Sequence, residues 1–164
     1  MIHKSPEYVI REILVERGLS LVVAESCTGG LVSHRVTNVP GSSAYFLGGV
    51  VAYDNAVKMR ALGVHKKTLD MYGAVSKETV IEMAKGVRQI LRADIGLSTS
   101  GIAGPGGGTD EKPVGLTWIG ICADQFDRAW RYVWPGDRLA IKEQTAEKAL
   151  ELLVEYLLGI IVAF

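Results

Sequence analysis

Apolar residues recur along this chain with two alternating periods, one typical of amphipathic helices and one typical of buried strands. Ser5, Pro6 and Glu7 predict the start of a first helix, because they provide an N-cap, a first-turn proline and an acid, and Gly18 predicts its end. Short β-rich runs and longer helical periods then alternate. The predicted strands cover residues 19–24, 46–53, 95–100, 114–122 and 129–134, and the predicted later helices cover residues 31–39, 55–62, 76–91 and 138–158.

The order of these elements indicates an α/β fold. Strands separated by helices predict a mostly parallel sheet covered on both faces, and a hairpin turn over residues 123–127 requires at least one antiparallel strand. The chain of 164 residues falls within the usual size of one domain and contains no internal repeat, linker or low-complexity segment. We therefore expect a single domain over residues 1–164.

The charge balance argues against a nucleic-acid partner. Eighteen lysines and arginines balance eighteen aspartates and glutamates, so the overall charge does not favour a phosphate backbone. The two cysteines, Cys27 and Cys122, lie far apart and lack the close spacing of a metal site. We expect a reducing compartment and no structural zinc.

The two ends of the chain do not predict contact with a membrane. The N-terminal residues lack the apolar run of a secretory signal, so we expect a cytoplasmic protein. Residues 149–164 are strongly apolar but are too few to span a bilayer, and they include Glu151 and Glu155. We expect a packed helix whose tail covers the core or a subunit interface, and a homodimer is the first expectation.

Two loops that follow predicted strands carry the candidate chemistry. In α/β sheets, ligands bind at the carboxyl ends of the strands, and both the turn at Ser26 and the glycine-rich loop over residues 101–109 lie there. Unpaired N–H groups near Thr28, Gly29 and Gly30 would suit an oxyanion or a phosphate. The sequence thus predicts an anion-binding edge.

A serine nucleophile at position 26 would need a base other than histidine. His3, His34 and His65 lie in poorly matched contexts for a serine–histidine–aspartate triad. Lys58, early in a predicted helix, is the nearest candidate, provided that burial or positive charge lowers its pKa.

Each candidate residue also has a purely structural interpretation. Ser26 could cap a helix, Cys27 could be a small buried side chain instead of a helix-terminal thiolate, and Tyr53 could fill the core. Lys58 could be an ordinary solvated lysine. Arg138 could pair with the preceding aspartate or lie in water instead of binding phosphate.

Seven short motifs together resemble the CinA C-terminal family. They occur in the family's order and cover nearly the whole chain, which makes the set far more specific than any one string. The motifs are Ala24–Gly30 (AESCTGG), Pro40–Ala44 (PGSSA), Tyr53–Asn55 (YDN) with Lys58, Tyr72–Ser76 (YGAVS), Ser100–Gly107 (SGIAGPGG), Lys112–Gly115 (KPVG) and Gly136–Arg138 (GDR).

This resemblance implies a three-layer α/β/α fold with a mixed sheet and a chemical activity. The best-characterised stand-alone members of the family are amidases that convert nicotinamide mononucleotide to nicotinate mononucleotide and ammonia. We expect no metal or organic cofactor. The resemblance implies that Ser26 is the nucleophile, that Tyr53 and Lys58 assist it, and that Arg138 is functionally important. Longer members carry a further N-terminal domain linked to ADP-ribose pyrophosphatase activity, which we do not expect here.

The resemblance leads to a mechanistic hypothesis. Ser26, deprotonated through Lys58 with help from Tyr53, attacks the carboxamide carbon. Among the substrate-binding residues, the N–H groups of the turn at Thr28, Gly29 and Gly30 stabilise the tetrahedral oxyanion. The glycine loop with Gly101 and Gly104, together with Arg138, holds the ribose phosphate. Lys142 lies where relatives often have an arginine, so a two-pronged phosphate contact is lost there.

Two alternative functions remain open at this stage. The chain could be a nucleotide-binding module without catalysis, or a partner protein linked to recombination or DNA uptake. Neutral charge and the lack of a basic aromatic surface argue against direct DNA binding.

Overall fold

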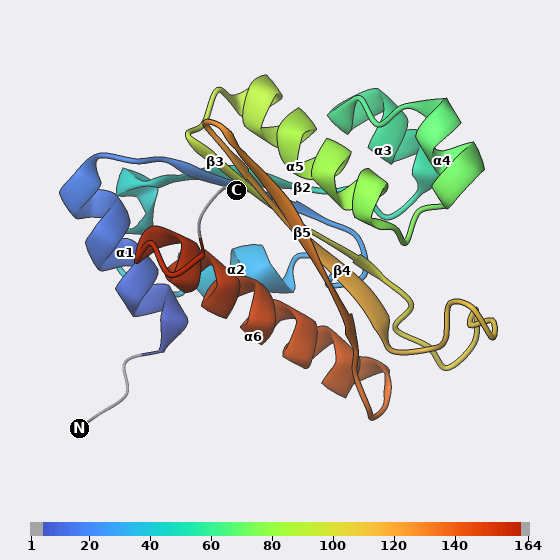
Figure 1. Cartoon of the computed structure of the whole chain (residues 1–164). Coiled ribbons are helices and arrows are strands. Elements are labelled where there is room, and N and C mark those ends of the chain that lie inside the picture. The colour runs from blue at the N-terminus through green and yellow to red at the C-terminus, as the bar shows by residue number, and fades with distance from the viewer. Residues whose placement is uncertain (1–4, 162–164) are drawn as a thin grey trace.

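The computed structural model describes residues 5–161 as a sheet flanked by helices (Figure 1). The strands are β1 (Leu21–Glu25), β2 (Phe46–Val51), β3 (Ile95–Gly101), β4 (Leu116–Ala123) and β5 (Phe126–Val133). The helices are α1 (Pro6–Arg17), α2 (Leu31–Thr37), the 3-10 turn η1 (Ser42–Ala44), α3 (Asn55–Leu62), α4 (Lys66–Tyr72), α5 (Lys77–Leu91) and α6 (Arg138–Leu157). The alternation of strands and helices follows the sequence prediction.

The five strands form one mixed sheet in the order β2-β1-β3-β4-β5. β1 pairs in parallel with both β2 and β3, whereas β4 runs antiparallel to β3 and to β5. Because β5 is antiparallel to a strand that is itself antiparallel to β3, β5 shares the direction of β1, β2 and β3. The predicted mixed, mostly parallel sheet is therefore confirmed.

Helices cover both faces of this sheet, which gives the three-layer α/β/α arrangement. Helices α1, α2 and α6 lie on one face and α3, α4 and α5 on the other (Figure 1). Strand β1 explains why both faces need a cover: Leu21 and Val23 pack into the core beneath the first group of helices, and Val22 and Ala24 pack beneath the second. Successive side chains point to opposite faces of a strand, so a strand with apolar residues on both faces must be covered on both.

Two glycines allow α5 to lie close to its neighbours. A Cβ atom on Gly86 would stand 1.7 Å from the carbonyl oxygen of Leu62 in α3, and one on Gly96 in β3 would stand 2.2 Å from the carbonyl oxygen of Ala84 in α5. Both distances are far below van der Waals contact. The backbone contacts that seat α5 thus require these glycines.

Helix α4 is the main element that the hydrophobic pattern did not predict. It has seven residues, and Thr68 is its one buried side chain. A single amphipathic period cannot be recognised in so short and polar a segment. Its position depends on packing against α5 and on Glu82, which accepts hydrogen bonds from Thr68 Oγ1 at 2.7 Å and from the N–H of His65 at 2.9 Å.

Several predicted boundaries also shift. Strand β2 ends at Val51 instead of residue 53, and β4 begins at Leu116 instead of residue 114. The hairpin is tighter than predicted, because β5 already begins at Phe126 and Gln125 turns the chain with φ of 53°. Over residues 5–161, no helix combines the length and apolar character needed to cross a membrane.

Candidate active site

The carboxyl ends of β1, β2 and β3 meet around a cavity of about 200 Å³. Parallel strands end at the same edge of a sheet, so segments that are distant in sequence converge there. The cavity is lined by Ser26, Cys27, Tyr53, Asn55, Lys58, Ala74, Val75, Ser100, Gly101 and Ala103. The structure thus brings together all three predicted catalytic residues and one of the predicted binding glycines.

Ser26 lies in the turn immediately after β1 and is 7% exposed. Its N–H donates to the carbonyl oxygen of Thr99 at 2.9 Å, and its own carbonyl oxygen accepts from the N–H of Gly29 at 3.1 Å. Within residues 5–161 its hydroxyl has no hydrogen-bond partner. The N-cap position of α2 is Gly30, so the interpretation of Ser26 as a helix cap is wrong.

The predicted donors of the Ser26 turn are only partly available. The N–H of Gly29 is bound to Ser26, and the N–H of Gly30 donates to the Glu25 carboxylate at 3.1 Å, so the expectation that both are unpaired is wrong. The N–H groups of Cys27 and Thr28 have no other described residue as acceptor. The turn therefore offers donors one and two residues after the serine.

Lys58 is 1% exposed although its position in α3 gives no sign of burial in the sequence. Its Nζ donates to the carbonyl oxygen of Tyr53 at 3.1 Å. Burial lowers the pKa of the Lys58 ammonium, and the charge of Asp54 opposes this shift only in part. The interpretation of Lys58 as a solvated lysine is wrong, and the side chain instead faces the cavity that Ser26 lines.

Arg138 connects three segments at the rim of the cavity. Its Nη2 donates to the Tyr53 hydroxyl at 2.5 Å, and its Nη1 donates to the carbonyl oxygen of Gly104 at 2.7 Å. Asp137 does not pair with it, because Asp137 caps α6 by accepting from the N–H of Ala140 at 2.9 Å. Tyr53 is 58% exposed, so it is not core filler.

Cys27 is adjacent to Ser26, but its surroundings do not favour a thiolate. Its side chain is 4% exposed, and burial raises the pKa of the thiol to about 12. A thiol with that pKa is protonated at neutral pH. The structure therefore supports the interpretation of Cys27 as a small buried side chain.

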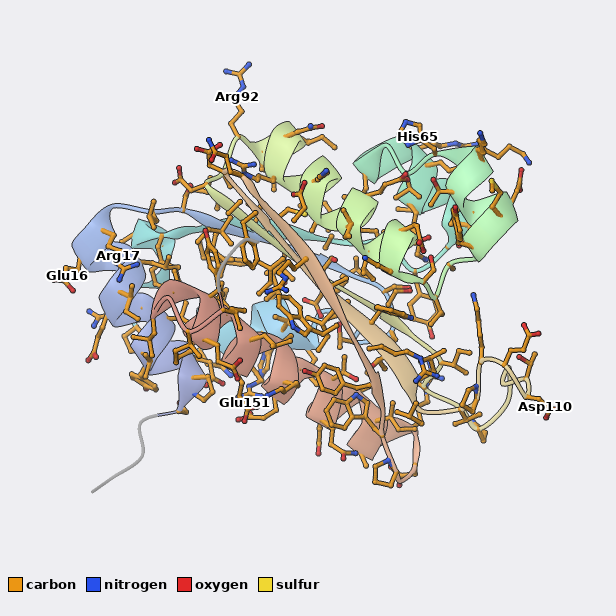
Figure 2. The ribbon with its side chains drawn as sticks, viewed as in Figure 1. Glu16, Arg17, His65, Arg92, Asp110 and Glu151 are labelled. Carbon is orange, nitrogen blue, oxygen red and sulfur yellow. The ribbon has the colours of Figure 1, made fainter. Side chains whose placement is uncertain are left out.

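The described histidines take no part in this cavity. His65 lies on the outer surface beside α3 and α4, where its Nδ1 stands 3.1 Å from Glu82 Oε1 (Figure 2). His34 lines a neighbouring cavity of about 360 Å³ together with Thr28, Gly29, Gly30 and Lys142, and His3 lies outside the described residues. Within residues 5–161, therefore, no histidine lines the cavity at Ser26.

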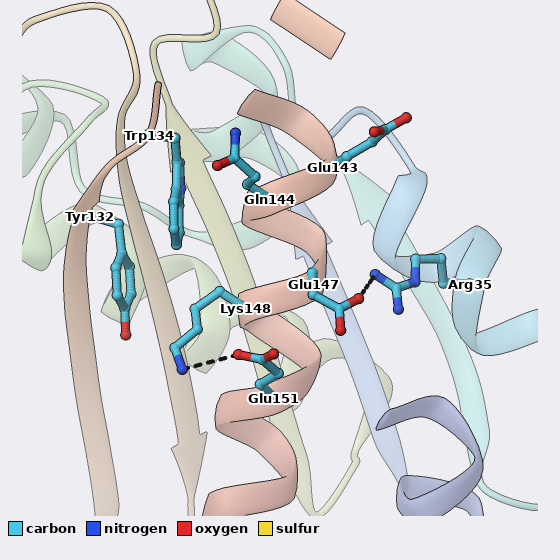
Figure 3. Close-up of a pocket in the computed structure, with 8 residues that line it drawn as sticks. All are labelled: Arg35, Tyr132, Trp134, Glu143, Gln144, Glu147, Lys148 and Glu151. Carbon is cyan, nitrogen blue, oxygen red and sulfur yellow. Dashed lines mark hydrogen bonds and ion pairs between the residues drawn. The ribbon is translucent and has the colours of Figure 1, made fainter. Parts of the chain in front are cut away.

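A larger cavity, of about 690 Å³, lies along α6 beside Tyr132 of β5 and Trp134, which follows β5 (Figure 3). Tyr132 and Trp134 stack on one wall with ring centroids 4.8 Å apart. Most of its charged side chains are paired, including Lys148 with Glu151 at 3.1 Å. It contains no candidate nucleophile, so size alone does not identify the active site. In the described part of the chain, no three His, Cys, Asp or Glu side chains gather as metal ligands.

Fold and site together define a class: an α/β/α domain that places a serine and a buried lysine at the carboxyl edge of a mostly parallel sheet. The chain belongs to the CinA family, since the model of the CinA C-terminal domain matches residues 3–157.

Known relatives support this assignment in sequence and in structure. A CinA-like protein of Chloroherpeton thalassium is 51% identical over 152 residues, which cover 90% of this chain and 36% of that protein. A CinA superfamily crystal structure from Klebsiella pneumoniae has a TM-score of 0.90 at 31% identity and covers 95% of this chain and 99% of its own. The competence/damage inducible protein CihA of Agrobacterium tumefaciens has a TM-score of 0.84 at 38% identity, covering 94% and 96%. The chain spans about a third of the length of the curated relatives it matches.

Proposed function

We propose that this domain hydrolyses the carboxamide of nicotinamide mononucleotide to nicotinate mononucleotide and ammonia. The observation that carries the proposal is a serine with an unbonded hydroxyl and a fully buried lysine lining one cavity. A buried lysine with a lowered pKa is an established way of activating a nucleophile in place of histidine. The choice of nicotinamide mononucleotide as the substrate comes from the CinA family, which includes such amidases.

The first step of the proposed reaction is attack by Ser26. Neutral Lys58 takes the hydroxyl proton as the Ser26 Oγ bonds to the carboxamide carbon, and a tetrahedral intermediate forms. The main-chain carbonyl of Tyr53 orients the lysine through its hydrogen bond to Nζ. Lys58 then returns the proton to the leaving nitrogen, and ammonia departs as the acyl-enzyme ester forms. Water attacks this ester in the second half-reaction, releases the carboxylate and restores Ser26.

The developing oxyanion requires donors that are not already engaged. The N–H groups of Cys27 and Thr28 meet this condition, whereas those of Gly29 and Gly30 do not. A donor directly after the nucleophile is the arrangement that other α/β hydrolases use. One such donor stabilises the transition state by about 3 to 4 kcal/mol.

The ribose phosphate is assigned to the Arg138 side of the site. Arg138 uses one N–H on each terminal nitrogen for Gly104 and Tyr53, and its remaining donors can meet a phosphate. Gly101 lines the cavity, and Gly104 is held at its rim by Arg138. This arrangement would favour the nucleotide over free nicotinamide.

The proposal is tested by incubating the protein with nicotinamide mononucleotide and a chelator and by measuring ammonia and nicotinate mononucleotide. Ser26→Ala should abolish product, whereas Ser43→Ala, which removes an exposed hydroxyl from η1, should not. Tight nucleotide binding without ammonia would identify a non-catalytic binding module instead. Absence of both binding and turnover would favour the role of a partner protein.

A further inference from the structure

A continuous set of buried side-chain hydrogen bonds surrounds the turn that carries Ser26. We infer that Glu25, Thr28 and Thr99 are positioning residues that fix the Ser26 hydroxyl for attack, an inference that rests on the proposed function of that serine. This role belongs to the three side chains, which act on the turn and not on the substrate; the main-chain N–H of Thr28 is separately one of the proposed oxyanion donors. All three side chains are 0% exposed.

Glu25 holds the first turn of α2 from inside the protein. Its Oε2 accepts from Thr28 Oγ1 at 2.6 Å and from the N–H of Val32 at 3.0 Å, and its Oε1 accepts from the N–H of Ser33 at 2.8 Å and from Ser33 Oγ at 2.7 Å. With the N–H of Gly30, these donors place the carboxylate at the positive end of the helix. A buried carboxylate with five donors is fully satisfied and strongly oriented.

Thr99 joins this cluster to β3. The hydroxyls of Thr28 and Thr99 stand 2.7 Å apart. Since the single proton of the Thr28 hydroxyl goes to Glu25, Thr99 is the donor to Thr28. The carbonyl oxygen of Thr99 also accepts from the N–H of Ser26 at 2.9 Å. The backbone of Ser26 is thus fixed in two ways: Ser26 directly follows the anchored Glu25 in the chain, and its N–H is bound to Thr99.

This arrangement argues against a substrate anion site at the start of α2. The N–H groups that would receive a phosphate there already bind the carboxylate of Glu25. An added anion would face a buried negative charge at close range. The cluster therefore has a positioning role, and the substrate phosphate belongs at Arg138.

Glu25→Gln tests the carboxylate. Whichever way the amide turns, its NH₂ faces a backbone N–H that previously donated to oxygen, so the turn must move. We expect kcat to fall by about 100-fold, the usual consequence of a misplacement near 1 Å, with KM changed by less than about threefold. Glu7→Gln is the matched control, because Glu7 is also a buried carboxylate but binds Arg35 and lies away from Ser26. It should lose stability with kcat unchanged.

Thr28→Val and Thr99→Val test the chain of hydroxyls. Each substitution should lower kcat by about tenfold. The kcat of the double variant should be no lower than that of the less active single variant, because the two hydroxyls act as one unit. Thr145→Val is the control: its hydroxyl is equally buried but donates to the carbonyl oxygen of Ile141 within α6. If the network variants keep the kcat of Thr145→Val, or change only KM, the inference is overturned.

Two further measurements separate this inference from the proposed amidase activity. Labelling of Ser26 by a fluorophosphonate probe, read by mass spectrometry, reports the nucleophile without nicotinamide mononucleotide and should slow in the network variants but not in the controls. If the wild-type protein neither turns over nor reacts, the proposed function fails. Amide hydrogen exchange across residues 26–33 then decides the positioning role: faster exchange in Thr99→Val than in Thr145→Val supports it, and equal exchange overturns it.

Discussion

Among single residues, Lys58 shows how burial can change the acid–base properties of a side chain. Lysine is normally charged and exposed, but here its side chain is 1% exposed and its Nζ has one described partner, the carbonyl oxygen of Tyr53. Burial disfavours the ammonium form and lowers its pKa, so the neutral amine becomes accessible at lower pH than in water. The same side chain on the surface could not act as a base near neutrality.

A pH profile checks this role of Lys58. Because its pKa in the folded protein lies below the ordinary 10.5, the neutral base accumulates as pH rises, and kcat/KM should increase through an apparent pKa below 10.5. Lys58→Arg should lose at least about 100-fold in kcat/KM and show no such limb, because arginine stays protonated. An identical rising limb in Lys58→Arg would exclude Lys58 as the base. Arg60→Lys, on an exposed position of the same helix, is the control.

At the scale of elements, the N-terminus of α6 joins the separate segments of the site. Arg138 reaches the connection after β2 through Tyr53 and the loop after β3 through Gly104. A lysine keeps the charge but has one nitrogen instead of the planar fork, whose Nη1 and Nη2 reach the two acceptors separately. The fork of the guanidinium, more than its charge, therefore fixes the rim of the cavity.

Arg138→Lys tests the role of the two hydrogen bonds from Arg138 to Tyr53 and Gly104. We expect kcat/KM for nicotinamide mononucleotide to fall by about tenfold, mostly through a higher KM, because the phosphate contact and the placement of Tyr53 weaken together. Steady-state kinetics on the variant and on Arg60→Lys provide the comparison. An unchanged KM would show that Arg138 does not bind the substrate.

The close packing of α5 against α3 gives a second prediction at this scale. Gly86→Ala should destabilise the fold by about 3 kcal/mol, because its Cβ would stand 1.7 Å from the Leu62 carbonyl oxygen and two helices would have to separate. Gly106→Ala should have little effect, since no atom lies within 4 Å of its Cβ position. Urea unfolding midpoints measure both, and equal midpoints would contradict the packing argument.

At the scale of the whole molecule, apolar surface remains exposed just after α6. Leu158 is 55% exposed and Ile160 is 66% exposed. Residues 162–164, which were also expected to belong to an interface, lie outside the described residues. Exposed apolar side chains close together are characteristic of surfaces that another subunit covers.

We therefore predict a homodimer through this surface. Sedimentation velocity should give twice the chain mass of 17.7 kDa, and Leu158→Ser with Ile160→Ser should shift the protein toward the monomer while circular dichroism is unchanged. A wild-type monomer at micromolar concentration would contradict the prediction. If the double variant stayed a dimer, the interface would not depend on Leu158 and Ile160.

Sequence reasoning predicted most of the fold because the information is local. The two hydrophobic periods gave the order of strands and helices, and the strand order explains why Ser26, Tyr53 and Gly101 reach one edge. It missed α4, whose short polar segment depends on contacts with α5. It also missed Glu25, although an acid at the end of an apolar strand was a usable signal.

Periodicity and turn residues in the sequence were enough to predict the order of all five strands and of every long helix, the mostly parallel sheet and the residue types at its carboxyl edge, but not α4. Three features emerge only once the chain is folded: the burial of Lys58, the engagement of the Gly29 and Gly30 N–H groups, and the connection of Glu25 through Thr28 to Thr99. The physical reason is that pKa and hydrogen-bond availability depend on which distant segments exclude water from a group. Thr28 and Thr99 are 71 residues apart, and no local pattern records that their hydroxyls meet.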